Sequence, residues 1–309
     1  MAQVFIVDEA FDHALFENSS CAFGVFDGVH RGHRYLLDCA QETARARGGL
    51  SIALTFDIDP DEVFDPDGIK KLMSNEARIA TLARTGVDAV AVLPFTREFA
   101  SLSPKEFLAT TFNGHAPAFL HVGLDFRFGA RAAGSVTDLG EWGARSGTHI
   151  NAHNLQIDEG EPITATRIRK VLAQHDLAEA RRLLGHGYFI LERIQPGRGD
   201  GANMGFATAN IVVPPNRRAL ADGVYSAYAY VDGKKYRAAV SVGVSPVFAD
   251  KTNATCEAHI LDFDGDIYGE TIEIEFMEFL RPMIKFDTTD ELIRTVMNNI
   301  EYTRASLPL

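Results

Sequence analysis

The sequence has few cysteines and no cysteine motif. Cys21, Cys39 and Cys256 are its only 3 cysteines; they lie far apart, and no CxxC pair occurs. A disulfide framework or a zinc knuckle needs paired or closely spaced cysteines, so we expect neither. The cysteine content fits the reducing cytoplasm, which is the predicted location.

Long apolar runs and an excess of basic charge are also missing. No apolar run approaches the roughly 20 residues that a membrane span needs. The N-terminus, MAQVFIVDEAFD, carries early acids and no basic segment, so we expect no signal peptide. The formal net charge is -12, and phosphates repel an acidic surface. We therefore expect no nucleic-acid or membrane partner, and RIRK (167–170) and the pair Arg181 and Arg182 are interpreted as solvated helix faces. The oligomeric state stays open.

Two widespread catalytic signatures are absent as well. No GxxxxGK[ST] occurs, which excludes a Walker loop, and no HExxH occurs, which excludes a zincin site. The rest is an ordinary globular composition, 46% hydrophobic over 309 residues, long enough for two domains.

The first half alternates short apolar runs with helical patterns. Such alternation predicts a mostly parallel sheet wrapped by helices, with ligands at the carboxyl ends of the strands. Ser103, Pro104 and Glu106 form a predicted capping box with proline at the first helical position. The expected strands are 21–26, 51–56, 89–95 and 118–123, and the expected helices include 33–48, 75–85, 165–173 and 176–184.

The second half is rich in β-type segments that succeed one another directly. Asp232 and Gly233 predict a tight hairpin, and 264–266 a further turn. Thr288 and Glu291 predict a capping box that opens a final helix. Antiparallel strands closed by one helix indicate a small barrel. We place the boundary at residue 186, giving domains 1–186 and 187–309.

The segment GVFDGVHRGH (24–33) comes directly after the first of these strands and ends where a helix begins. Glycines allow a backbone to approach a phosphate closely, and a helix N-terminus offers free N–H groups to an anion. His30 and His33 add donors that can be cationic near neutral pH. The combination suits a nucleoside triphosphate, although two histidines in a loop can also be structural.

His-x-Gly-His after a first strand resembles the nucleotidyltransferase signature. A longer series resembles one branch, the bacterial bifunctional riboflavin kinase/FAD synthetase family, and runs in that family's order. The resemblance implies a Rossmann-like α/β nucleotidyltransferase domain with a parallel sheet, then a riboflavin kinase domain, a small antiparallel β-barrel with a C-terminal helix. The series comprises GVFDGVHRGH, TFDIDP (55–60), HVGLDFRFG (121–129), ITATRIRKVL (163–172), GFATAN (205–210), DGVYSA (222–227), SVGVSPVF (241–248) and CEAHILDFDGDIYG (256–269).

For the first domain, the resemblance implies transfer of AMP from ATP to FMN with release of pyrophosphate. His30 and His33 would contact the ATP phosphates as catalytic donors. The other implied residues are Gly24 and Phe26 at the nucleotide, Thr166 and Arg169 at the triphosphate, and Asp125 and Arg127 on the flavin and phosphate side. An ordinary ion pair remains the alternative for either arginine, and a loop cap for Asp125.

For the second domain, the resemblance implies ATP-dependent phosphorylation of riboflavin to FMN with Mg²⁺. Glu257 matches the family's catalytic carboxylate, Thr208 its magnesium ligand and Asn210 its phosphate ligand. The alternative for Glu257 is an exposed strand carboxylate. His259 is interpreted as structural.

The sequence departs from the family pattern at several positions. Ala207 replaces a proline, Ser245 and Val247 replace an arginine and a threonine, and Asp59 stands in the segment where a histidine is usual. Asp59 is also a candidate structural cap. In 164–166 one of the family's hydroxyls is missing. Whether these changes impair either activity, and the relative rates of the two, are not set by the sequence.

Three functions are compatible with these patterns. The first is a two-activity enzyme that converts riboflavin to FMN and FMN to FAD. The second is an FMN adenylyltransferase whose kinase domain is weakened or only binds flavin. The third, a flavin sensor without enzymatic activity, is disfavoured because no DNA-binding segment is added and the charge is acidic.

Overall fold

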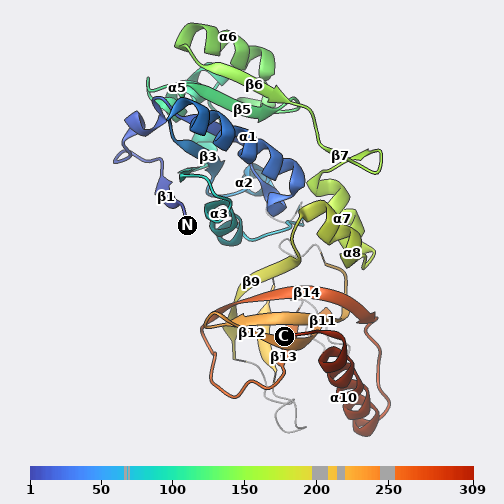
Figure 1. The fold of residues 1–309 in the computed structure, drawn as a ribbon. Coiled ribbons are helices and arrows are strands. Elements are labelled where there is room, and N and C mark those ends of the chain that lie inside the picture. The colour runs from blue at the N-terminus through green and yellow to red at the C-terminus, as the bar shows by residue number, and fades with distance from the viewer. Residues whose placement is uncertain (66–67, 69, 197–207, 214–219, 244–254) are drawn as a thin grey trace. The chain divides into compact units, whose positions relative to one another are not determined.

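The computed structural model of the chain describes residues 1–65, 68, 70–196, 208–213, 220–243 and 255–309. Its contacts divide the chain into two compact units. The first contains Met1–Ile69 and Asn75–Thr164, and the second contains Lys70–Ser74 and Ala165–Leu309 (Figure 1). The domain boundary that we expect at residue 186 separates two segments that should each fold alone. It stays a prediction.

The first unit contains a parallel sheet, as the alternating pattern predicted. Its described strands number 6 and have the order β1-β4-β3-β2-β5-β6. Every residue of SIALTF (51–56) is buried, because helices cover both faces of a central parallel strand. The strands are β1 (Gln3–Ile6), β2 (Ser20–Phe23), β3 (Ser51–Phe56), β4 (Ala89–Leu93), β5 (Phe119–Gly123) and β6 (His149–His153).

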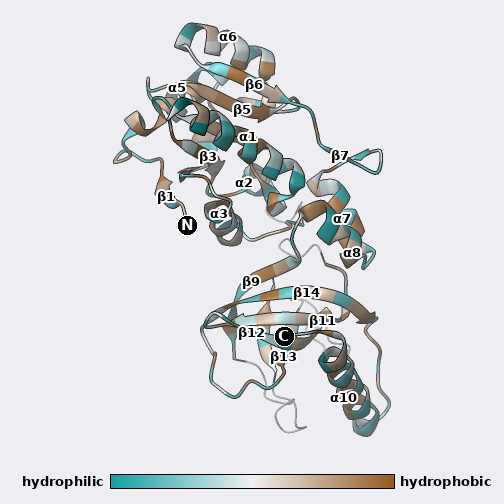
Figure 2. Cartoon of the chain, in the orientation of Figure 1, coloured by the Kyte–Doolittle hydropathy of each residue, from teal (hydrophilic) through white to brown (hydrophobic). Residues whose placement is uncertain are grey.

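Helix α1 (Arg31–Arg47) shows how the helices attach to this sheet. It buries Leu36, Leu37, Ala40 and Ala44 and contacts β2, β3 and β5. The visible outer side of α1 is mostly hydrophilic, whereas β5 is mostly hydrophobic (Figure 2). The other described helices of this unit are η1 (His13–Phe16), η2 (Asp27–Val29), α2 (Pro60–Phe64), α3 (Asn75–Ala83), α4 (Arg97–Ala100), α5 (Pro104–Phe112), η3 (Ala130–Ala132) and α6 (Val136–Ser146).

The cap predicted for α5 is confirmed, whereas the one predicted for the last helix is only half formed. The Ser103 Oγ accepts from the Glu106 N–H at 3.3 Å, and the Glu106 carboxylate accepts from the Ser103 N–H at 2.9 Å. At α10 (Thr289–Ser306), Thr288 accepts from the Glu291 N–H. The Glu291 carboxylate accepts instead from the N–H of Asp287, one residue earlier than predicted.

The predicted barrel is confirmed in the second unit. Its described strands close in the order β10-β13-β12-β11-β14-β9, all antiparallel. Asp232 and Gly233 form the predicted hairpin with φ of 48° and 73°, values that a type I′ turn requires. The strands are β9 (Tyr188–Gln195), β10 (Ala209–Val212), β11 (Gly223–Val231), β12 (Lys234–Gly243), β13 (Thr255–Ile260) and β14 (Thr271–Arg281).

Three helices of the described residues accompany the barrel within the second unit. The last, α10, covers Ala239 and Leu261 with one apolar face. Helices α7 (Ala165–Ala173) and α8 (Leu177–Leu184) contact each other, and α8 also contacts β9 and β14. Between them, the His175 ring stacks on Phe279 at 3.9 Å, and its Nδ1 lies 2.9 Å from the Tyr225 hydroxyl.

Several elements were not expected from the sequence. Strands β1 and β6, helix α6 and the short ladder of β7 (Ile157–Asp158) with β8 (Glu161–Pro162) were missed. The strand expected over 21–26 ends at Phe23, because 24–29 form a turn with positive φ at Phe26, Gly28 and Val29. No helix within the described ranges is both long and apolar enough to cross a membrane.

Candidate active sites on the sheet and the barrel

The turn between β2 and α1 lies at the carboxyl end of a central strand. Phe26 and Val29 have φ of 61° and 39°, in the left-handed region that side chains other than glycine rarely adopt. Strained backbone of this kind persists where the surrounding structure holds it, often at functional sites. The geometry therefore places GVFDGVHRGH (24–33) at the ligand-binding edge expected for this fold.

His30 and His33 lie together, as the motif predicted. The His30 Nδ1 accepts a hydrogen bond from the His33 N–H at 3.3 Å and so caps α1. The two rings stack with centroids 3.6 Å apart. Phe26 meets the edge of His33 at 5.3 Å, and a Cβ added to Gly24 would lie 3.3 Å from the Phe26 ring. Four of the predicted nucleotide residues thus form one continuous cluster.

The sequence allowed either imidazole to be cationic near neutral pH, and the structure disfavours the cationic form of His33. Burial lowers the pKa of His33 well below its ordinary value, and the neighbouring charges of His30 and Arg78 lower it further. Its Nδ1 is buried without a hydrogen-bond partner among the described residues. His33 is therefore neutral near pH 7 in the unliganded protein, and it can offer one N–H donor but no positive charge.

Arg78 is a residue of this site that the sequence reading missed. It lies on α3, is 2% exposed, and donates to the carbonyl of Val25 at 2.8 Å. Its position gives a weak sequence signal, because Arg78 precedes the buried Leu82 by four residues on the same helix face.

Asp125 and Arg127 come directly after β5, the strand next to β2, so they share its carboxyl edge. Both side chains are exposed. Arg127 forms no ion pair with any described residue, and Asp125 accepts no hydrogen bond from one, so neither the ion-pair nor the loop-cap alternative is supported. Phe126 between them packs on Phe23 with centroids 5.1 Å apart. Both polar groups are available to a ligand.

Thr166 and Arg169 lie on α7, in the second unit. Arg169 donates from Nε to the carbonyl of Lys70. Three other arginines here form ion pairs: Arg167 and Arg182 with Glu179, and Arg181 with Glu275. The Arg167 side chain is only 13% exposed, so it does not lie on the solvated helix face expected for RIRK (167–170). The triphosphate role of Thr166 and Arg169 stays a prediction of the resemblance.

The barrel carries the second polar cluster on its outer face. Glu257 on β13 is directly opposite Asn210 on β10 and Ser241 on β12, and residues paired across strands share a face. All three are partly exposed. Thr208 immediately precedes β10 and is also partly exposed. Ser241 is a further site candidate that the sequence reading missed.

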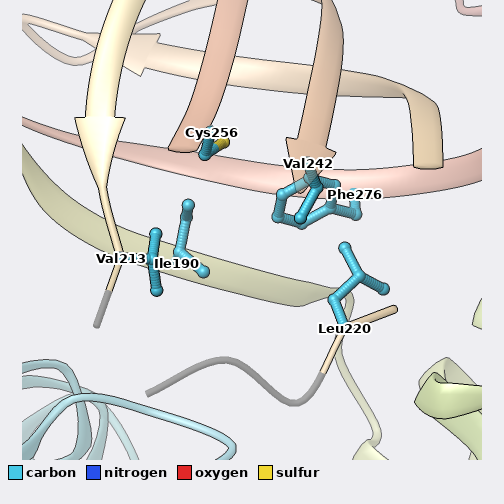
Figure 3. Close-up of a pocket in the computed structure, with 6 residues that line it drawn as sticks. All are labelled: Ile190, Val213, Leu220, Val242, Cys256 and Phe276. Atoms are coloured by element: carbon cyan, nitrogen blue, oxygen red, sulfur yellow. The ribbon is translucent and has the colours of Figure 1, made fainter. Parts of the chain in front are cut away.

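Side-chain alternation along β13 explains why Glu257 faces outward. Its neighbours Cys256 and Ala258 are 1% and 0% exposed. Figure 3 shows Cys256 pointing into an apolar cavity. Glu257 therefore stands on the opposite face of the strand. The cavity is lined by Ile190, Val213, Leu220, Val242, Cys256 and Phe276.

The donors on this face suit a magnesium ion better than a transition metal. A hydroxyl, an amide oxygen and a carboxylate are oxygen ligands, which Mg²⁺ prefers, and it usually keeps waters and substrate phosphates in its shell. Within the described parts of the chain, no three His, Cys, Asp or Glu side chains gather as a ready-made metal cage.

The departures from the family pattern fall partly outside the described residues. Ala207, Ser245 and Val247 lie there. Asp59 is described, and it acts as the structural cap predicted for it. Its carboxylate accepts from the Asp61 N–H at 3.1 Å, and Glu62 accepts from the Asp59 N–H at 3.2 Å.

Comparisons with known proteins agree with both halves. The family model described as FAD synthetase matches residues 12–167, and the one described as riboflavin kinase matches 184–307. A bifunctional riboflavin kinase/FMN adenylyltransferase of Listeria monocytogenes is 32% identical over 93% of this chain and 92% of its own. The Escherichia coli K12 enzyme of the same name is 35% identical over 89% and 88%.

A solved structure from Streptococcus pneumoniae, described as a macrolide-efflux protein, shares the whole fold. It has a TM-score of 0.82 and 30% identity, and the match covers 97% of this chain and 98% of that one. Both enzyme domains, in the same order and at nearly full length, therefore place this chain in the family of bifunctional riboflavin kinase/FMN adenylyltransferases.

Proposed function

We propose that the barrel phosphorylates riboflavin to FMN through Glu257, and that the sheet unit joins FMN to AMP through His30 and His33. The observation that carries the two-activity function is the pairing of Glu257 with Asn210 across β13 and β10. This pairing supports the kinase activity. The kinase domain is the one in which Ala207, Ser245 and Val247 depart from the family pattern.

In the kinase step, Glu257 accepts the proton of the ribityl 5′-hydroxyl as that oxygen attacks the γ-phosphorus of ATP. ADP is the leaving group. Thr208 and Asn210 hold the phosphates and the magnesium that accompanies them. When bound, Mg²⁺ neutralises charge on the phosphate oxygens. Ser241, on the other side of Glu257, flanks the same carboxylate.

In the adenylyl step, an FMN phosphate oxygen attacks the α-phosphorus of ATP, and pyrophosphate leaves. No protein nucleophile is needed, so the site must orient two anions and stabilise the leaving group. His30 and His33 donate to the phosphates, and Gly24 and Phe26 shape the nucleotide pocket. Asp125 and Arg127 hold the flavin side, and Thr166 and Arg169 hold the triphosphate.

The proposed setting is the cytoplasm, with riboflavin, FMN and ATP as small-molecule partners. All 3 cysteines are free thiols, which fits a reducing compartment. The arginines of α7 and α8 that pair with Glu179 and Glu275 are engaged within the unit, which leaves them less available for phosphates of nucleic acid or lipid.

The test is an assay of the pure protein with riboflavin, ATP and Mg²⁺, with products separated by chromatography. FMN and then FAD is the expected result. FAD from added FMN, without FMN from riboflavin, would instead establish the adenylyltransferase-only function. Tight flavin binding without either product would contradict enzymatic function altogether.

Two fragments test the boundary predicted at residue 186. We expect 187–309 to fold and bind riboflavin, because its closed barrel has its own core. We expect the fragment 165–309 to unfold at a higher temperature than the fragment 187–309. The reason is that α8 buries Leu177, Ala180, Leu183 and Leu184 and that His175 packs on the barrel. Circular dichroism and flavin fluorescence measure both. An unfolded 187–309 beside a folded 165–309 would move the boundary to residue 164.

A further inference from the structure

A buried guanidinium lies behind the turn that carries the two histidines. Arg78 is 2% exposed, and its Nη1 donates to the Val25 carbonyl at 2.8 Å and to the Thr55 Oγ at 2.6 Å. Its Nη2 donates to the Phe56 carbonyl at 2.8 Å and to the Asn75 side chain at 3.3 Å. One side chain thus ties together the turn after β2, the end of β3 and the start of α3.

The contact with Val25 matters because the next residues along the chain have unfavourable backbone angles. Phe26 has a φ of 61° and Val29 a φ of 39°, and the β-branched Val29 is especially unfavourable there. Thr55 adds a second bond, donating its hydroxyl to the same Val25 carbonyl at 3.3 Å. The carbonyl next to the strained turn is therefore held by two donors, and the turn presents Phe26 to His33.

The direct partners of Arg78 are neutral, so its charge is not cancelled by a bonded carboxylate. Its charge is stabilised at longer range by Asp27, Asp57, Asp59 and Glu76, whereas burial lowers the pKa of its guanidinium. An arginine still remains protonated at pH 7. The same cation helps to lower the pKa of His33, which shows that it acts electrostatically on the histidine cluster.

We propose that Arg78 is a positioning residue for adenylyl transfer, which holds the Val25–Phe26 backbone so that the stacked His30 and His33 face the ATP phosphates. It also places a buried positive charge behind those donors, where an anion is to be bound. Arg78 does not touch substrate, and it acts through the turn. The proposal rests on the proposed adenylyltransferase function of this site.

The test compares Arg78→Ala, Arg78→Lys and the exposed control Arg84→Ala in the full-length chain. We expect Arg78→Ala to lower kcat for FAD formation from FMN by about 10- to 100-fold, since a misplacement of about 1 Å can have an effect of that size. Lysine keeps the charge but not the fork that reaches four acceptors, so Arg78→Lys should be intermediate. Arg84→Ala should match wild type. Added guanidinium ion should restore part of the Arg78→Ala rate.

Riboflavin phosphorylation takes place in the other unit and should not change. Circular dichroism and thermal unfolding of the full-length variants report whether the unit that contains Arg78 is folded. The His33 imidazole, monitored by NMR, should titrate at a higher pH in Arg78→Ala than in the wild type, because this variant lacks the cation. An Arg78→Ala variant that keeps wild-type kcat and KM for ATP would overturn the proposal. If that variant does not fold, Arg78→Lys decides, and wild-type kcat there would overturn it equally. A wild-type protein that makes no FAD would instead refute the adenylyltransferase function itself.

Discussion

Glu257→Gln is expected to lower riboflavin phosphorylation by about 10²- to 10⁴-fold, the range typical for loss of a general base. Glutamine keeps the size of the side chain, and Glu257 stands on the outer, partly exposed face of β13, so the barrel should not be disturbed. An amide cannot accept the hydroxyl proton of riboflavin. Adenylylation of added FMN should remain within about twofold of wild type, because the sheet unit is unaltered.

The matched control for this variant is Glu270→Gln. Glu270 is an exposed carboxylate immediately before β14 in the same barrel, outside the polar row of Asn210, Glu257 and Ser241. The Glu270→Gln variant should phosphorylate riboflavin at the wild-type rate. The measurement is initial FMN formation at saturating ATP, with thermal unfolding of all three proteins alongside. Normal FMN formation by Glu257→Gln would return Glu257 to an ordinary strand carboxylate.

The parallel sheet was predictable because its central strands are buried. SIALTF (51–56) and AVAVL (89–93) are buried along their whole length and so form unbroken apolar runs. The missed strands β1 and β6 lie at the two edges of this sheet. Three of the four residues of QVFI (3–6) are exposed, and HINAH (149–153) carries two histidines and an asparagine. An edge strand pairs with only one neighbouring strand and is less buried than a central strand. Its sequence therefore predicts a strand less clearly.

Helix α6 was missed for a different reason. VTDLGEWGARS (136–146) contains two glycines, which disfavour a helix by about 1 kcal/mol each relative to alanine. Gly143 is required by packing, because an added Cβ would lie 2.6 Å from the Thr148 carbonyl. Tertiary structure thus overrides local propensity at this helix, which no local pattern reveals.

The motif allowed us to predict that His30 and His33 lie together at the turn, but it did not allow us to predict their charge. The pKa of His33 is lowered by burial and then by the neighbouring charges of His30 and Arg78. Each of these arises from residues distant in sequence or from the final packing. Arg78 is the clearest case, since its four acceptors come from three separate segments of the chain. The contacts of His175 with the barrel residues Tyr225 and Phe279 could not be predicted from the sequence either.

His33→Ala is expected to lower FAD formation from FMN by about 10²- to 10³-fold, as for removal of one donor that stabilises a transition state. The His33 side chain stacks on His30 and meets Phe26, so its loss removes a donor and also loosens the neighbouring donor. Because His33 is neutral before ATP binds, the loss is of a hydrogen bond and not of a resident positive charge. The effect should therefore fall mainly on kcat and change little with ionic strength.

The control for that variant is His149→Ala, which removes an exposed imidazole from the same sheet. His149 begins β6, so it lies at the amino edge, whereas His33 lies beyond the carboxyl edge of β2. Its variant should make FAD at the wild-type rate, and both variants should phosphorylate riboflavin normally. The measurement is FAD formation with varied ATP and FMN at two salt concentrations. A His33→Ala rate within about twofold of wild type would refute the phosphate contact. If high salt lowered the wild-type rate as much as the His33→Ala substitution lowers the rate at low salt, a charged imidazole, and not a neutral one, would meet the phosphates.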